Sequence, residues 1–512
     1  MGTRLAIRSG WALLLVLVVG LSASAEVRLP GLFGDHMVFQ RGLPVPVWGW
    51  ADAGEQVTVT WDDQTHTAVA DDQGRWSVKL DAMPAGGPHT VRVAGSNAIE
   101  LADVLVGEVW VASGQSNMQW TVAASANPEA EQAAAEFPRI RMFTVDRVTA
   151  EAPQETCGGA WQVCSPETVS SFSAVAYYFG RALHQELDVP VGLINTSWGG
   201  TPIEAWTSLA VQESLPGLEP HLTQWQQQVE AFDPAAARAQ FERQLAEWEE
   251  AAAAAHAAGR EAPRKPTPPT DPRTSPHRPA SLYNGMVAPL APYAIRGGIW
   301  YQGESNAGRA HLYAMQLRAM IENWRELWGQ GDFPFAWVQL ANFMAPQEQP
   351  SEGGWAWIRE QMVRALEVPN TGMAVIIDIG EADDIHPRNK QDVGGRLALW
   401  ALSQVYGQEG IVYSGPLYRS MRRAGNAIEL EFDHAEGLTA QGEELTGFAI
   451  AGADRQFVWA DARIEDGKVI VSSPEVAEPV AVRYGWANNP PCNLYNAAGL
   501  PASPFRTDDW ED

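Results

Sequence analysis

Residues 26–105 show the alternation of hydrophobic and polar positions that half-buried β-strands have. In residues 57–61, two valines and a tryptophan alternate with two threonines, and this period of two puts the apolar side chains on one face of a strand. Clusters of Pro, Gly and Asp separate such runs, and residues 71–74 have the composition of a hairpin turn. We therefore predict an N-terminal β-sandwich domain over residues 26–105, whose role is that of a scaffold or of a carbohydrate-binding module.

From residue 106 onward the apolar runs become continuous and alternate with helical patterns. Continuous apolar strands are typical of a parallel sheet that helices cover on both faces. We therefore predict an α/β domain over residues 106–406. The runs that predict its strands are residues 109–112, 191–194, 298–301, 335–338 and 373–377.

An insertion interrupts this pattern at residues 210–283. Phe241, Leu245 and Trp248 have helical spacing and would face one side of a helix. Residues 263–279 are too rich in proline for regular structure. This stretch is predicted to be an exposed loop, either a solvated linker or a lid near the active site.

After residue 406 the alternating pattern returns. Ile428, Leu430 and Phe432 are separated by two glutamates, which predicts another strand with one buried face. We predict a C-terminal β domain over residues 407–512, although its strands could also join the first β domain.

The first 25 residues have the pattern of a secretion signal. Arg4 and Arg8 precede an apolar stretch at residues 11–21, and residues 23–25 read Ala-Ser-Ala, as at a cleavage site. The apolar stretch is too short for a stable membrane span, although an N-terminal anchor is the alternative. We expect an exported protein, periplasmic or extracellular, that has no membrane contact after signal cleavage.

Composition narrows the classes of partner. The chain has 62 acidic and 35 basic residues and a net charge of -27, which argues against nucleic acid as a partner. Cys157 and Cys164 are close enough to bridge a small loop, and Cys492 is left over. Because these cysteines lack metal-ligand spacing with nearby histidines, we expect no metal and no cofactor. The oligomeric state is not predicted.

Residues 114–118, Gly-Gln-Ser-Asn-Met, directly follow the apolar run at 109–112. A serine at the carboxyl end of a central strand stands where open α/β sheets bind ligands. Its hydroxyl is a weak nucleophile, so it needs a general base and hydrogen-bond donors for the oxyanion that forms on attack.

Three later stretches contain the residue types that such a serine needs. They are residues 195–202 with two adjacent glycines, residues 302–306 with Glu304 and Asn306, and residues 383–387 with His386. His386 would be the general base, and Asn306 and a glycine N–H would bind the oxyanion. A carboxylate would orient His386.

Several segments together resemble the sialate O-acetylesterase family, which belongs to the SGNH hydrolase superfamily and is related to xylan acetylesterases. The resemblance covers nearly all of the mature chain. The central segments are Gly-Gln-Ser-Asn-Met (114–118), Ser-Trp-Gly-Gly-Thr-Pro-Ile-Glu-Ala-Trp (197–206), Trp-Tyr-Gln-Gly-Glu-Ser-Asn (300–306) and Asp-Ile-His-Pro-Arg-Asn-Lys-Gln (384–391), with residues 35–41, 47–50, 493–496 and 499–507 as further segments.

The resemblance implies a flavodoxin-like α/β/α core with a parallel sheet and no metal. It implies Ser116 as nucleophile, His386 as base, and Ser116, Gly199 or Gly200 and Asn306 as the oxyanion hole. The superfamily places its third triad residue three positions before the histidine, which is Asp383; relatives often have an aspartate two before, which is Asp384. We favour Asp383, since a three-residue offset lets a tight turn bring the carboxylate to the ring.

The function that this implies is a secreted carbohydrate O-acetylesterase that works through a serine acetyl-enzyme. Acetylated sialic acid is the first expected substrate and acetylated xylan or another plant glycan the second. A glycan-binding protein without catalysis is the alternative class, although an intact Ser, His and Asn set argues against it. Substrate-binding candidates are Gln115, Trp198, Gln302, Glu304 and Arg359, with a purely structural role equally open for Glu304.

Overall fold

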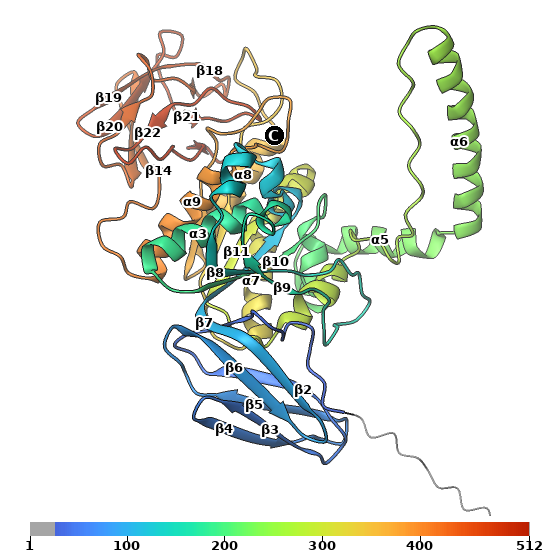
Figure 1. Ribbon diagram of the computed structural model, residues 1–512. Helices are drawn as coiled ribbons and strands as arrows, with labels where there is room; N and C mark the ends of the chain where they lie inside the picture. The colour runs from blue at the N-terminus through green and yellow to red at the C-terminus, as the bar shows by residue number, and fades with distance from the viewer. Residues whose placement is uncertain (1–25, 511–512) are drawn as a thin grey trace, which may run out of the picture.

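The computed structural model describes residues 26–510, so the predicted signal segment lies outside the described residues. Three regions follow one another in space (Figure 1): N-terminal β-sheets, an α/β core and C-terminal β-sheets. No helix within residues 26–510 has the length and hydrophobicity needed to cross a membrane.

Strand β7 (Ala98–Gly114) connects the first two regions, since it belongs to both. Its first half pairs antiparallel with β6 (Gly86–Ala94), and its second half pairs parallel with β10 and β11. The boundary predicted between residues 105 and 106 therefore falls within a continuous strand. The other N-terminal strands are β1 (Val38–Gln40), β2 (Val45–Trp50), β3 (Gln56–Trp61), β4 (Gln64–Val69) and β5 (Arg75–Leu80).

The alternation in residues 57–61 is confirmed, because Val57, Val59 and Trp61 of β3 are buried. The predicted hairpin turn is also present: the Gly74 N–H donates to the Asp71 carbonyl at 2.8 Å, and β5 begins at the next residue.

The core sheet has the strand order β13-β12-β11-β7-β10-β8-β9. All neighbours are parallel except β9, which is antiparallel to β8. The predicted parallel sheet is therefore confirmed, with one antiparallel edge strand. Its strands besides β7 are β8 (Phe137–Thr144), β9 (Trp161–Cys164), β10 (Val191–Ser197), β11 (Gly297–Tyr301), β12 (Phe335–Val338) and β13 (Thr371–Ala374).

Helices cover both faces of this sheet. Trp110 of β7 packs edge-on against Phe179 of helix α3, whereas Trp300 of β11 packs against Trp324 of helix α7. Trp300 is level with Ser113, three residues after Trp110, and side chains an odd number apart point to opposite faces. The helices of the core are α1 (Ser116–Gln119), α2 (Pro128–Ala133), α3 (Ala174–Leu187), α7 (Tyr313–Trp328), α8 (Gly354–Arg364) and α9 (Lys390–Trp400).

The insertion forms helices α4 (Leu209–Ser214), α5 (Glu219–Ala231) and α6 (Pro234–Ala257). Helix α6 projects from the body as an arm, and the chain returns beside it (Figure 1). The predicted helical face is confirmed, since Phe241, Leu245 and Trp248 are half-buried among exposed neighbours. Residues 263–279 contain neither helix nor strand, as the sequence predicts.

The C-terminal sheets have a separate hydrophobic core that includes Ile428, Leu430 and Phe432. Cys157, Cys164 and Cys492 are all free thiols, so Cys157 and Cys164 do not bridge the small loop between them. The strands of this region are β14 (Leu417–Ala424), β15 (Ala427–Asp433), β16 (Thr439–Ala440), β17 (Phe448–Ala451), β18 (Val458–Trp459), β19 (Asp461–Glu465), β20 (Lys468–Ser472), β21 (Ala481–Tyr484), β22 (Leu494–Tyr495) and β23 (Phe505–Arg506).

Candidate active site

Ser116 lies at a sharp turn between β7 and α1. Gly114 ends the strand with a φ of +140°, and a Cβ atom there would lie 2.1 Å from the Tyr301 carbonyl oxygen. Only glycine fits this position. The turn places Ser116 as the first residue of α1, at the carboxyl end of the central strand, where its side chain is half-buried.

His386 contacts this serine directly. Its Nε2 lies 2.9 Å from Ser116 Oγ, which is the distance of a hydrogen bond between a base and a hydroxyl nucleophile. The ring of Trp120, one turn beyond Ser116, stacks on the imidazole with centroids 4.6 Å apart and an angle of 12° between the planes. The imidazole is thus fixed on one face by Trp120 and at one nitrogen by the serine.

Asp384, rather than the favoured Asp383, lies beside His386. Its Oδ1 accepts the His386 backbone N–H at 2.9 Å and is 3.5 Å from Nδ1. Asp383 is exposed. An aspartate that bonds the backbone N–H two residues later forms a tight local turn, and this turn carries the carboxylate to the ring. The spacing favours Asp383, but the structure places Asp384 beside the imidazole instead.

The pKa of His386 lies below its ordinary value. Burial of the imidazole is the main cause, and the positive charge of Lys390 acts in the same direction. The Asp384 carboxylate opposes both by favouring the protonated ring. A lowered pKa keeps the imidazole neutral near pH 7, which is the form that can accept a proton.

A buried polar cluster joins the three catalytic loops behind Ser116. Asn117 Nδ2 donates to Glu304 at 2.6 Å and to the Ile385 carbonyl at 3.1 Å, and its Oδ1 accepts from Lys390 Nζ at 2.5 Å. The ammonium of Lys390 also lies 5.1 Å from the centre of the Tyr301 ring. Because each bond crosses to another loop, Asn117 fixes the spacing between the serine and histidine loops.

Burial shifts the pKa values of both ionisable members of this cluster. The pKa of Lys390 falls to about 7, because burial disfavours the ammonium more than the Glu304 carboxylate favours it. The pKa of Glu304 rises for the same reason, although Asn117 and Lys390 stabilise its charged form. Glu304 Oε2 is buried without a hydrogen-bond partner, so its carboxyl group faces the protein interior rather than an open substrate site.

Gly199 lies against Ser116. A Cβ atom at this position would be 3.3 Å from Ser116 Cβ, and its N–H donates to Gln119 Oε1 at 2.7 Å. Gly200 is exposed with a φ of +76°, and its carbonyl accepts a hydrogen bond from Ser305 Oγ. Of the two expected oxyanion glycines, Gly199 is the one that the contacts place beside Ser116.

Asn306 is fully buried, and its amide is bonded within the protein. Its Nδ2 donates to Glu204 at 2.9 Å, and its Oδ1 accepts from Gln302 at 2.7 Å and from the Ile203 N–H at 3.0 Å. One of its two N–H bonds is therefore used by Glu204. Gln302 is buried as well and also accepts from Tyr313, so it supports Asn306 rather than facing a substrate.

The remaining substrate-binding candidates differ in their surroundings. Arg359 is fully buried, and its guanidinium donates to the carbonyls of Leu340, Ala341, Ala487 and Asn488. The prediction that Arg359 meets substrate is wrong; it joins the core to the C-terminal region. Gln115 is nearly buried, whereas Trp198 is half-exposed, with the Arg147 guanidinium 5.8 Å from the centre of its ring.

Reasoning from the sequence missed four residues of this site: Asn117, Gln119, Glu204 and Lys390. Asn117, Glu204 and Lys390 lie inside the recognised motifs, and Gln119 is the first residue after the motif at 114–118. This closeness to the motifs was the available signal. Within residues 26–510, no group of three or more His, Cys, Asp or Glu side chains is arranged to hold a metal ion.

The chain is similar to known proteins along nearly its whole length. The model of the family "Carbohydrate esterase, sialic acid-specific acetylesterase" matches residues 106–257 and 274–402. Sialate O-acetylesterase from Rattus norvegicus is 30% identical over 550 residues, 96% of each chain, and that from Homo sapiens is 30% identical over 97% of this chain and 95% of its own. The crystal structure of a carbohydrate acetylesterase from Xanthomonas citri has a TM-score of 0.80 and 39% identity, and the match covers 94% of this chain and all of the other. Because these matches cover nearly its whole length, the chain belongs to the sialic acid-specific acetylesterase family of carbohydrate esterases.

Proposed function

We propose that the protein removes acetyl groups from sugar hydroxyls through an acetyl-enzyme on Ser116. The observation that carries this proposal is the 2.9 Å contact between Ser116 Oγ and His386 Nε2 at the carboxyl end of β7. The parallel core sheet, with its catalytic loops at one edge, supports an SGNH-type hydrolase fold. Membership of the esterase family supports the reaction class.

In the first half of the reaction, Ser116 Oγ attacks the acetyl carbonyl carbon and its proton moves to His386 Nε2. Asp384 holds the Nδ1 side of the ring and stabilises the imidazolium. The bond from the carbonyl carbon to the sugar oxygen then breaks, and His386 returns the proton to that oxygen. In the second half, His386 takes a proton from water, and the water oxygen attacks the acetyl carbon. The bond from that carbon to Ser116 Oγ then breaks, His386 returns the proton to Oγ, and acetate leaves.

The oxyanion that forms on attack needs preorganised donors. We assign the backbone N–H groups of Ser116 and Gly199 to this role, together with the N–H of Asn306 that Glu204 leaves free. The Gly199 N–H donates to Gln119 Oε1 at 2.7 Å, so the oxyanion would replace Gln119 as its acceptor.

Two sugar classes are candidates for the substrate. The names of the mammalian relatives point to acetylated sialic acid. The net charge of -27 favours a neutral glycan such as acetylated xylan, because like charges hinder the approach of an anionic sugar. Acetate release from both substrates, measured side by side, distinguishes them.

Replacing the nucleophile tests the mechanism. Ser116→Ala should lower kcat on an aryl acetate by roughly a million-fold, as loss of a triad serine does elsewhere. Ser113→Ala is the matched control, since Ser113 lies on β7 three residues before Ser116 and its buried hydroxyl has no partner. Near-normal turnover by Ser116→Ala would rule out this serine as the nucleophile.

We also propose that the protein is exported, as the pattern of residues 1–25 suggests. The N-terminal residue of the mature protein, determined after expression of the full chain, should be Glu26. An uncleaved N-terminus in the cell interior would contradict this proposal.

A further inference from the structure

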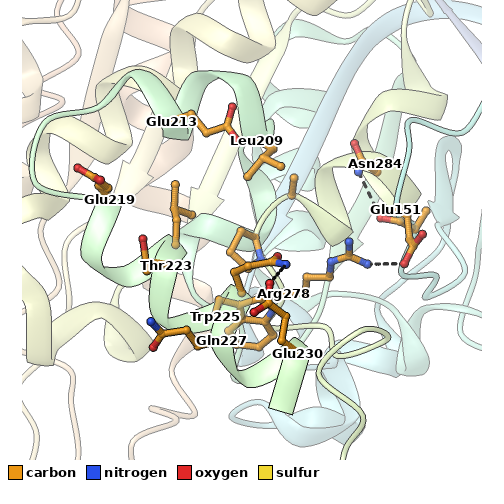
Figure 2. Close-up of a pocket in the computed structure, with 15 residues that line it drawn as sticks. Glu151, Leu209, Glu213, Glu219, Thr223, Trp225, Gln227, Glu230, Arg278 and Asn284 are labelled. Atoms are coloured by element: carbon orange, nitrogen blue, oxygen red, sulfur yellow. Dashed lines mark hydrogen bonds and ion pairs between the residues drawn. The ribbon is translucent and has the colours of Figure 1, made fainter. Parts of the chain in front are cut away.

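A pocket of about 580 Å³ lies between the insertion and the catalytic domain. Figure 2 shows that helix α5 forms one wall with Thr223, Trp225 and Gln227, and that Arg278 and Asn284 come from the opposite side. This volume is within the range of small-molecule sites. It is separate from the Ser116–His386 pair, and the mechanism above does not use it.

The lining of the pocket combines an aromatic ring with many hydrogen-bonding groups. Trp225 is half-buried, and its Nε1 is buried without a hydrogen-bond partner. Gln227 and Glu230 are exposed on the same helix. An aromatic surface beside amide and carboxylate groups suits a sugar ring, whose C–H faces are apolar and whose hydroxyls donate and accept hydrogen bonds.

The charge of the lining is negative. Four glutamates, Glu151, Glu213, Glu219 and Glu230, line the pocket together with one positive residue, Arg278. Arg278 Nη1 is already paired with Glu151 at 2.9 Å. An anionic ligand would therefore meet uncompensated carboxylates, whereas a neutral ligand would meet hydrogen-bond acceptors.

A short stretch of chain connects the pocket to the catalytic loop. The Nε2 of His277 lies 3.9 Å from the position that a Cβ atom on Gly200 would occupy, and the next three residues, 278–280, line the pocket. The Ala280 N–H donates to the Glu204 carbonyl at 2.9 Å. The pocket therefore begins one residue beyond a histidine whose side chain contacts the loop that contains Gly200.

We propose that this pocket binds a neutral sugar unit of the same glycan chain whose acetyl group is cleaved at Ser116. This inference rests on the proposed function and narrows its substrate to uncharged, multi-unit glycans. The pocket contributes to binding of the chain and has no part in the chemical step. Small esters that cannot span both sites do not benefit from it.

The first test compares two tryptophan variants on two substrates. Trp225→Ala should lower kcat/KM for acetylated xylo-oligosaccharides about tenfold, mainly through KM, because an aromatic contact with the sugar is lost. It should leave kcat/KM for 4-nitrophenyl acetate unchanged. Trp248→Ala, on the projecting helix α6, is the matched control and should change neither value. Gln227 is an exposed residue of the same wall, and Gln227→Ala should lower kcat/KM for the oligosaccharide severalfold. This variant keeps the proposal testable if Trp225→Ala does not fold.

Binding of unacetylated xylo-oligosaccharide, titrated by calorimetry, tests the pocket without any reaction. Wild type should bind it and both pocket variants should bind it more weakly. Equal binding by wild type and both variants would overturn the pocket proposal while leaving the esterase function intact. If wild type hydrolysed aryl acetate but no acetylated glycan, the proposed function would fail, whatever the titration showed.

The preference for neutral sugars has its own test. The double variant Glu219→Gln and Glu230→Gln keeps hydrogen-bonding groups but removes two charges. It should raise kcat/KM for an O-acetylated sialoside severalfold relative to that for the xylo-oligosaccharide. An unchanged ratio would overturn the claim that the pocket selects against anions.

Discussion

His386 lies between groups that act on its proton in opposite directions. Asp384 favours the protonated ring, whereas burial and the ammonium of Lys390 favour the neutral ring. Trp120 covers one face of the imidazole and Ser116 holds its Nε2. The net effect is a lowered pKa, which favours the neutral imidazole. The neutral ring is the form that a general base needs in order to accept a proton.

The aspartate beside the histidine was the least predictable part of the site. Spacing alone favours Asp383, because an offset of three suits a tight turn. Which aspartate lies beside the ring depends on which side chain accepts a hydrogen bond from the His386 backbone N–H. Asp384 Oδ1 accepts it at 2.9 Å. Such local side-chain to backbone competition cannot be seen in a motif.

Two conservative variants test this assignment. Asp384→Asn should lower kcat by up to roughly ten-thousand-fold, since the imidazole loses the carboxylate that sets its tautomer. Asp383→Asn should leave kcat close to wild type, because the exposed carboxylate touches no catalytic group. The measurement is steady-state hydrolysis of an aryl acetate, with circular dichroism as a check on folding. The opposite ranking would return the role to Asp383.

Lys390 should control the pH at which the enzyme loses activity in acid. Lys390→Met removes a positive charge that holds the pKa of His386 down, so that pKa should rise. The base is active only when neutral, so the acidic limb of kcat/KM should move to higher pH, by roughly half a pH unit for an interaction of about 0.7 kcal/mol.

Lys265→Met is the control, since Lys265 lies on the exposed return segment beside α6. A lower kcat with an unmoved acidic limb would mean that Lys390 acts only through the packing of Asn117. The shift should be clear below pH 7, because the pKa of Lys390 is about 7 and its charge is largely lost above it.

At the scale of elements, strand β7 connects the N-terminal sheets to the turn that holds Ser116. Its buried Glu108 accepts from Gln40 at 3.1 Å and from Arg296 at 2.7 Å, and it also pairs with Arg41. These partners come from two distant parts of the chain, residues 40–41 and residue 296. Continuous apolar runs predicted a strand here, but they gave no sign that one strand of 17 residues serves two sheets.

Removing this carboxylate should destabilise the protein. Glu108→Gln leaves two arginines without their buried partner, and breaking such a pair costs about 3–5 kcal/mol. We expect a loss of about 3 kcal/mol, since both arginines are partly exposed and can reach water. Glu100→Gln, an exposed residue of the same strand, is the control in urea unfolding. Equal midpoints for the two variants would contradict a stabilising role for Glu108.

At the scale of the whole molecule, periodicity predicted the order of regions: β, α/β and β. The prediction succeeded because the two kinds of strand have different patterns. A strand buried on one face alternates apolar and polar residues, as in 57–61, whereas a strand buried on both faces is apolar throughout, as in 191–194. It could not predict how the regions attach. Arg359, which donates to carbonyls at 340–341 and 487–488, lies in a stretch that reads equally well as part of a substrate site.

The arm formed by α6 and its return segment should be dispensable for catalysis. Within it, Trp248 Nε1 donates to the Pro263 carbonyl at 2.7 Å, and Lys265 lies over the Trp248 ring at 5.3 Å, so its contacts are largely internal. Replacing residues 236–268 by a short Gly/Ser linker should therefore leave kcat on 4-nitrophenyl acetate unchanged and shift the thermal midpoint by only a few degrees, roughly what the loss of 1 kcal/mol causes in a large domain. The pocket beside α5 lies outside the deleted segment, so hydrolysis of acetylated xylo-oligosaccharide should persist as well. A selective loss of oligosaccharide activity, with aryl acetate hydrolysis retained, would instead mean that the arm holds the glycan chain.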